Sequence, residues 1–166
     1  PNLPTRDMTH VNQHQNAFVD ISPDGRYILG RMDFSYVSPP SLFCYVYDRT
    51  TSSYSVIGFD EHPIDDWTPK AEGLLFTEFP AMSPNGVWVT GTAYMSKATT
   101  GSAFSSEYRV AFRYNVKTKA FEVYDGEEDK DIYGASVDNE GKVYGATHGL
   151  HPLLAAESSL TYTPPT

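Results

Sequence analysis

The chain has 166 residues, of which 40% are hydrophobic and 14% aromatic, with 12 Gly, 12 Pro and one cysteine. This length suffices for one ordinary domain with a packed core, and the many aromatic and turn-forming residues favour β-structure. The formal net charge of −9 excludes the phosphate backbone of nucleic acid as a main partner and disfavours an anionic membrane surface. No apolar run is long enough to be inserted across a membrane.

The first residues predict an arm followed by a hairpin. Residues 1–16 are polar without a clear period, and because the chain begins at Pro1 without Met, we expect a removed leader or a piece of a longer protein. Strands are expected at 17–21 and 26–34. The turn between them is Ser22-Pro-Asp-Gly25, in which Pro presets φ, Asp bonds nearby backbone and Gly takes a positive φ.

The segment from Ile21 to Gly30 is repeated along the chain. Ile-Ser-Pro-Asp-Gly-Arg-Tyr-Ile-Leu-Gly returns as Met-Ser-Pro-Asn-Gly-Val-Trp-Val-Thr-Gly at 82–91, and in a weaker form at 136–145. A second hairpin is expected over 42–59, and its Tyr-Asp, Thr, Tyr and Val positions recur between Tyr114 and Val123. The repeat unit is therefore two hairpins, or four antiparallel strands.

Tandem four-stranded antiparallel units are typical of β-propeller blades. The third unit contains only its first hairpin, followed by a candidate third strand near 150–156, so the fold class is all-β, a partial β-propeller with two full units and part of a third. The expected divisions are an N-terminal arm at 1–16, blade 1 at 17–60, blade 2 at 61–125, partial blade 3 at 126–156 and a C-terminal tail at 157–166.

Two residues of types that often act in catalysis or binding are interpreted as core residues. Cys44 stands among strand-forming residues without a nearby His in sequence, which favours a small buried side chain over a nucleophile. Trp88 lies within a predicted strand, which favours packing in the core.

The stretch from Ile21 to Gly30, followed by Tyr45-Val-Tyr-Asp48, resembles the Ser-x-Asp-Gly-x-x-x-x-Gly repeats of secreted bacterial propeller-like proteins. The HAF-type extracellular repeat is the nearest, and the TolB-type PD40 blade is a looser relative. The resemblance covers about residues 17–149. It implies an extracellular or periplasmic location and leaves the function open, because such blades support many unrelated activities.

Antiparallel order sorts the connections into two sides. Short turns follow the first and third strands of each unit, whereas long loops follow the second and fourth strands. Long loops carried by a rigid sheet are the usual place for binding sites. The long loops are expected at 35–41, 60–74, 96–107 and 125–131.

The longest of these loops concentrates acidic and aromatic residues. Asp60-Glu-His-Pro-Ile-Asp-Asp-Trp67 carries four carboxylates, and 126–131 adds four more. A solvated charged loop, a Ca²⁺ site and a pair of acids for glycoside hydrolysis are the alternatives for these residues. Trp67 with Phe34, Tyr36 and Phe104 could instead form a platform on which a sugar or peptide stacks. The candidate ligand-binding residues are Trp67, Asp65, Asp66, Glu61, Tyr36 and Phe104.

No recognised motif for a nucleophile, a metal-dependent hydrolase, a phosphate or a dinucleotide occurs in the chain. The leading hypothesis is therefore a non-catalytic binding or scaffold segment of a secreted propeller, with a glycan, peptide or protein as ligand and no cofactor apart from the Ca²⁺ alternative. The second hypothesis is the propeller portion of a hydrolase or glycan-active enzyme, and the third is a purely structural spacer. Expected partners are other blades of a longer chain or a second copy of this one.

Overall fold

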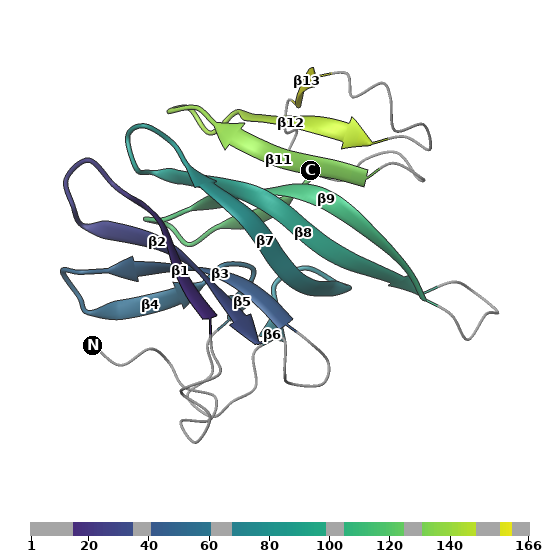
Figure 1. Ribbon diagram of the computed structural model, residues 1–166, viewed down its shortest axis with the longest axis horizontal. Coiled ribbons are helices and arrows are strands. Elements are labelled where there is room, and N and C mark those ends of the chain that lie inside the picture. Colours follow the sequence, from purple (N-terminus) through teal and green to yellow (C-terminus); the bar gives the residue numbers. More distant parts are fainter. Residues whose placement is uncertain are drawn as a thin grey trace.

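The computed structural model describes residues 15–34, 41–60, 68–98, 105–124, 131–148 and 157–160 (Figure 1). Within these ranges every regular element is a β-strand, so the expected all-β class is confirmed. These same ranges contain no helix long and apolar enough to cross a membrane. The strands are β1 (Gln15–Ile21), β2 (Tyr27–Phe34), β3 (Ser41–Asp48), β4 (Ser53–Val56), β5 (Phe59–Asp60), β6 (Thr68–Pro69), β7 (Leu74–Met82), β8 (Trp88–Ala98), β9 (Ser105–Asn115), β10 (Phe121–Val123), β11 (Asp131–Val137), β12 (Val143–His148) and β13 (Glu157–Leu160).

The strands form three successive antiparallel sheets. Sheet 1 contains β1 to β4, sheet 2 contains β7 to β10, and sheet 3 contains β11 to β13, each in chain order. Strands β5 and β6 form a separate two-stranded pair between sheets 1 and 2 along the chain. Because neighbours in the sequence are also neighbours in the sheet, each four-stranded sheet is a simple meander, as the two-hairpin repeat predicts.

The repeated turns have the predicted geometry. Gly25 and Gly86 have φ values of 69° and 71°, and Gly141 of the third unit has 84°. Each donates its N–H to the residue three positions earlier, for example Gly25 to the carbonyl of Ser22 at 2.8 Å. The hydroxyl of Ser22 then accepts the N–H of Tyr27 at 2.9 Å. The repeated spacing of the turn thus reflects hydrogen bonds that close the loop on its first residue.

The glycine that ends the repeat makes room for an aromatic ring in the first two units. A Cβ on Gly30 would lie 2.3 Å from the ring of Tyr45, and a Cβ on Gly91 would lie 2.7 Å from Phe112. Each glycine is the cross-strand neighbour of the aromatic residue that it contacts. In these two units the repeat therefore carries Gly at this position because the ring of an aromatic residue in the next strand lies across it.

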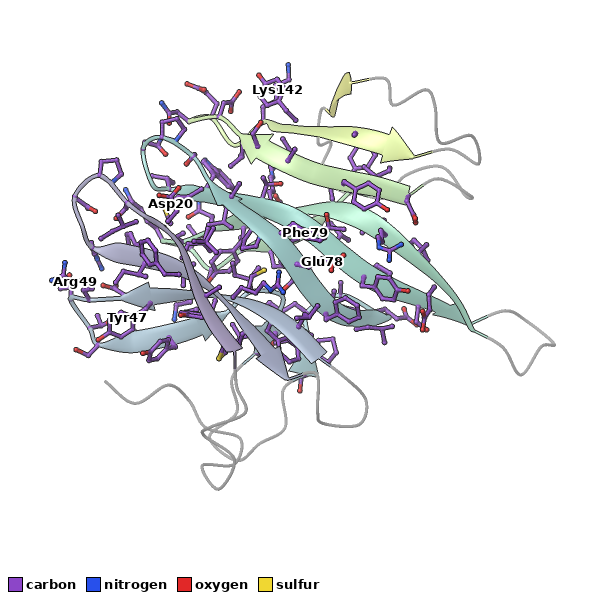
Figure 2. The ribbon with its side chains drawn as sticks, viewed as in Figure 1. Asp20, Tyr47, Arg49, Glu78, Phe79 and Lys142 are labelled. Atoms are coloured by element: carbon purple, nitrogen blue, oxygen red, sulfur yellow. The ribbon has the colours of Figure 1, made fainter. Side chains whose placement is uncertain are left out.

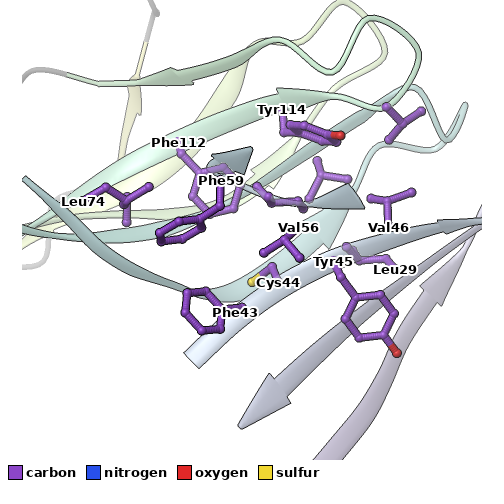
Figure 3. Packing of buried hydrophobic residues seen from close by; sticks show 14 of the residues in the cluster. Leu29, Phe43, Cys44, Tyr45, Val46, Val56, Phe59, Leu74, Phe112 and Tyr114 are labelled. Carbon is purple, nitrogen blue, oxygen red and sulfur yellow. The ribbon is translucent and has the colours of Figure 1, made fainter. Parts of the chain in front are cut away.

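Sheet 2 packs against one face of sheet 1. Figure 3 shows Tyr45 on the opposite side of β3 from Phe112 and Tyr114, which identifies the face of sheet 1 that meets sheet 2. Thr77 of β7 links the two sheets, because its hydroxyl accepts the N–H of Cys44 at 3.0 Å and donates to the carbonyl of Ile57 at 3.4 Å. The shared core includes Leu29, Cys44, Val46, Val56, Val89, Phe112 and Tyr114.

Sheet 3 packs against the other face of sheet 2. Strand β11 contacts β8 and β9, and a second core cluster joins Ala111 of sheet 2 to Ile132, Val137 and Val143 of sheet 3. Trp88 packs against this cluster, in agreement with its predicted core role. Gly134 lies so close to Gly91 that a Cβ would come within 2.4 Å of the Gly91 carbonyl oxygen. The three sheets therefore form a stack in chain order.

The short turns also stack from sheet to sheet. A Cβ on Gly86 would lie 2.4 Å from the Cβ of Ser22, which places the second turn against the first. The backbone N–H of Asn85 donates to Oδ1 of Asn139 at 2.9 Å, which joins the second turn to the third. The short connections thus lie on one side of the stack, as antiparallel order predicts.

Some boundaries differ from the expectation. Strand β1 begins at Gln15, inside the expected arm, and the β8–β9 hairpin extends to Ala98 and Ser105, so the connection between these strands is shorter than expected. Sheet 3 gains β13, which pairs with β12 inside the segment expected to be a tail. The expected third strand at 150–156 lies outside the described residues. These differences arise at strand ends, where pairing with a neighbour rather than local sequence decides the length.

Candidate binding surfaces

The predicted ligand-binding residues all fall in the connections that the structure leaves undescribed. Trp67, Asp65, Asp66, Glu61, Tyr36 and Phe104 lie outside the described residues. The long-loop site therefore stays a prediction. Phe34, the other proposed member of the platform, is described only as the last residue of β2.

The structure describes the two ends of the acidic loop, and these ends are paired with each other. Strands β5 and β6 pair Phe59 with Pro69 and Asp60 with Thr68, so the two ends of the 61–67 connection are held together. The Lys70 ammonium lies 3.4 Å from the Asp60 carboxylate, and Phe59 packs edge-on against the ring of Phe43 at 4.9 Å. The first carboxylate of the predicted acidic run thus has a cation as its partner, and it lies where the two ends of the loop are paired.

A metal site is not assembled within the described part of the chain. There, no three His, Cys, Asp or Glu side chains come together in a way that could hold an ion. Cys44 is fully buried, and burial raises the pKa of its thiol to about 12. A thiol with such a pKa is neutral at physiological pH and is a poor nucleophile, which agrees with the predicted packing role.

Each first strand of the stack contains a β-bulge. Register shifts occur between Phe18 and Asp20 in β1, between Glu78 and Ala81 in β7, and between Gly134 and Ser136 in β11. These strands are edge strands, and a bulge at an edge twists it away from regular pairing with another strand. Strands β1 and β7 contact each other.

Two exposed phenylalanines occupy equivalent repeat positions of β1 and β7. Phe18 precedes the Ser-Pro turn by four residues, and Phe79 precedes the second Ser-Pro turn by the same interval. Their exposures are 64% and 58%, the largest among the exposed large hydrophobic residues described. Figure 2 shows Phe79 beside Glu78 on β7. The third unit has Gly134 at this position, where Gly91 and Thr90 of the neighbouring sheet leave no room for a side chain.

Phe79 also has an unusual backbone conformation. Its φ is 52°, in the left-handed region that bulky side chains rarely adopt. The carbonyl oxygen of the preceding Glu78 lies 2.7 Å from where a Cβ on Gly91 would be. The bulge therefore packs closely against Gly91, which has no side chain. Such strain persists only where the surrounding structure enforces it, and it is common at functional sites.

A group of charges ties the bulged region to the neighbouring sheets. Arg109 of β9 donates its backbone N–H to Oδ1 of Asp131 at 3.0 Å, and its guanidinium lies 3.2 Å from Oδ2. The same guanidinium lies 3.7 Å from the carboxylate of Glu78. Burial raises the pKa of Glu78, although the positive charges of Arg109 and Arg31 act in the opposite direction. These charges are paired with one another, which is typical of a supporting network.

The outer face of sheet 1 is an aromatic surface. It is defined by Ile28, Tyr45, Tyr47 and Tyr54, which are joined by cross-strand pairing and by ring contacts of 4.5 Å and 5.7 Å. The equivalent positions in sheet 2 are Val89, Phe112, Tyr114 and Phe121.

The two equivalent faces differ in burial. Val89 and Tyr114 are 0% and 1% exposed, because they pack against sheet 1. Their counterparts Ile28 and Tyr47 are only partly buried. At these two positions the face is therefore less covered in sheet 1 than in sheet 2, whereas Tyr45 is buried like its counterpart Phe112.

Sequence reasoning missed the exposed phenylalanines, although the repeat contained them. Comparison of Phe18-Val-Asp-Ile-Ser-Pro with Phe79-Pro-Ala-Met-Ser-Pro would have aligned the two rings. It would not have predicted their exposure, because an aromatic residue in a strand is more often buried.

Comparisons with models of protein families, with curated proteins and with solved structures found no match to this chain.

Proposed function

We propose that the chain is a non-catalytic binding or scaffold segment of a β-propeller-type protein. The observation that carries this proposal is the repeated stacking of meander sheets, in which sheet 2 covers sheet 1 and sheet 3 covers sheet 2. The bulged first strands and the stacked short turns support the same arrangement, because they repeat from unit to unit.

In this proposal, the outer face of sheet 1 receives a further sheet of the same kind. The counterparts of Ile28 and Tyr47 in sheet 2 are fully buried by such a contact, and exposed aromatic surface gains free energy when it is covered. The further sheet belongs to additional blades of a longer chain or to a second copy. The long loops are the proposed ligand-binding side, and the resemblance to secreted repeat proteins supports an extracellular or periplasmic location.

Light scattering of the purified 166-residue chain tests the stacking. We expect self-association that depends on concentration, and we expect Tyr47→Lys to abolish it, since a charge in this face would be buried on association. Leu75→Lys is the matched control, because Leu75 is exposed but lies on β7 rather than on this face. A chain that stays monomeric at high concentration, or association that survives Tyr47→Lys, would refute the proposed role of the face.

A further inference from the structure

The outer face of sheet 1 carries an apolar row that spans all four strands. Cross-strand pairing places one residue of each strand in this row, which consists of Ile21, Ile28, Tyr47 and Tyr54. The corresponding rows of sheets 2 and 3 are also apolar, and they lie against the preceding sheet. In sheet 1, by contrast, Ile21 is 42% exposed. The row is therefore built like the two interfaces within the stack but is only partly covered.

Phe18 adds a projecting ring to the same face. It is paired with Gly30, which is in turn paired with Tyr45, so the register places Phe18 on the side of the sheet where the Tyr45 ring lies. Figure 3 shows the Tyr45 ring directed away from Phe112 and Tyr114 of sheet 2. Phe18 is 64% exposed. Its ring therefore stands on the outer face and not between sheets 1 and 2.

A projecting ring at this repeat position distinguishes the outer face from the interfaces within the stack. Gly134 has this position in sheet 3, and a Cβ there would lie 2.4 Å from the Gly91 carbonyl oxygen. Phe79 has this position in sheet 2, where its side chain is exposed and not enclosed between two sheets. A further sheet packed as closely as sheet 3 packs on sheet 2 would therefore collide with Phe18. The occupant of the outer face has to pack differently.

A second copy of the chain offers two outer faces, and they differ in polarity. On sheet 3, the Tyr144 hydroxyl donates to Asp138 at 3.1 Å, and the Lys142 ammonium lies 5.3 Å from the Tyr144 ring centre. An apolar row laid on this face would remove both charges from water without offering them a partner. Neither the row on sheet 1 nor Phe18 includes a charged residue. The outer face of sheet 1 is therefore a better match for its own copy than for sheet 3.

Size and charge indicate that such a contact is reversible. Four strands about 4.8 Å apart span about 15 Å, so two such faces together bury less than about 1,200 Å², the range of weak interfaces. The formal net charge of −9 on each copy opposes their approach. Salt screens this repulsion between the copies, whereas it leaves apolar contacts in place. Association should therefore depend on protein concentration and become stronger as salt is added.

From these observations we propose that the outer face of sheet 1 binds the same face of a second copy about a two-fold axis, with Phe18 of each copy covered in the contact. This inference rests on the proposed function, in which the outer face receives a further sheet. It goes further because it selects a second copy over additional blades, and sheet 1 over sheet 3 as the surface that copy presents. An interface of this symmetry uses the same face of both copies, so assembly stops at two chains.

Light scattering over a range of protein and salt concentrations tests the proposal. We expect the molar mass to rise with protein concentration and to level off at two chains, with more dimer in about 0.5 M than in about 0.05 M NaCl. Phe18→Asn should weaken dimerisation at least about ten-fold, because each dimer covers two Phe18 rings. Phe79→Asn is the matched control, because it replaces the same residue type at the same repeat position of sheet 2. It should leave dimerisation unchanged.

A second matched pair of variants identifies the faces that meet. Tyr47→Lys places a charge on the outer face of sheet 1 and should abolish association, whereas Tyr144→Lys places one on the outer face of sheet 3 and should have no effect. A fluorescently labelled Tyr47→Lys chain should also fail to bind the wild type in an anisotropy measurement. In a head-to-tail contact it would bind, because its sheet 3 would remain intact.

The possible results separate this inference from the proposed function. A chain that stays monomeric at every protein and salt concentration would refute both. Growth beyond two chains, loss of association in Tyr144→Lys, or binding of Tyr47→Lys to the wild type would leave the stacking in place and refute only the two-fold contact. Unchanged dimerisation of Phe18→Asn would refute it as well. Phe18 and Tyr144 are exposed, so these variants should remain folded, which thermal unfolding verifies.

Discussion

The two glycines of the repeated turn offer a controlled measurement of how firmly the sheets are stacked. Gly25 and Gly86 occupy the same repeat position and have φ values of 69° and 71°. Their surroundings differ. A Cβ on Gly25 would meet only the Arg49 guanidinium, at an ordinary 3.5 Å, whereas a Cβ on Gly86 would lie 2.4 Å from the Cβ and 3.0 Å from the Cα of Ser22. Alanine therefore strains both backbones equally but disturbs the contact between turns only at Gly86.

The expected magnitudes follow from these two contributions. The left-handed conformation costs alanine about 1–2 kcal/mol, and the loss of glycine flexibility in the unfolded chain returns about 0.4–1 kcal/mol. Gly25→Ala should therefore destabilise by at most about 1.6 kcal/mol. Gly86→Ala adds overpacking against a neighbouring backbone, which costs about 1–3 kcal/mol more.

Urea unfolding followed by circular dichroism measures both variants. The midpoint should fall further for Gly86→Ala, with the slope unchanged, since the compactness of the end states is the same. A double-mutant cycle should show a favourable coupling between Ser22→Gly and Gly86→Ala. The reason is that Ser22→Gly removes the Cβ with which the new Cβ at position 86 would clash. Equal losses for Gly25→Ala and Gly86→Ala would show that the second turn does not rest on the first, which would refute the stacking.

Three further predictions follow. Phe79→Asn should raise the free energy of unfolding by up to about 1 kcal/mol through relief of strain, measured in urea, and a clear loss would refute the strain. The Arg26 guanidinium holds the pKa of Asp48 at about 2, so stability present above the usual pKa near 4 should be lost as pH falls towards 2. This acid-dependent loss should be about 1 kcal/mol smaller in Arg26→Gln after allowance for screening, and equal acid unfolding curves would contradict the ion pair. Trp67→Ala combined with Asp65→Ala should abolish any glycan or Ca²⁺ binding by calorimetry, and surviving binding would place that site elsewhere.

The elements that could be predicted are those set by local chemistry. The Ser-Pro-Asp-Gly turn at 22–25 and its counterpart at 83–86 specify their own conformation, so the hairpins around them could be placed to within a few residues. Burial of Cys44 followed equally from its strand-forming neighbours. In the turns the deciding interactions lie within one hairpin, whereas the burial of Cys44 is completed by sheet 2 and was predicted only from the apolar pattern of its own strand.

The elements that could not be predicted depend on contacts between distant segments. The short β13 exists only as a partner of β12, and nothing in residues 157–160 alone indicates a strand. The bulge that turns Phe79 outward depends on the close approach of Gly91, which comes from the next strand. The candidate loop residues around Trp67 lie outside the described residues, so that site stays a prediction.

The two ends of the stack differ in chemistry, and the difference bears on where a further sheet would add. In sheet 3, Tyr144 stands where sheets 1 and 2 have Leu29 and Thr90, one position before the final glycine of the repeat. Its hydroxyl donates to Asp138 at 3.1 Å, and the Lys142 ammonium lies 5.3 Å from its ring centre. Covering this face would remove a lysine and a carboxylate from water, which is costly. The aromatic outer face of sheet 1 has no such charges among its defining residues, so the proposed stacking contact belongs at that end.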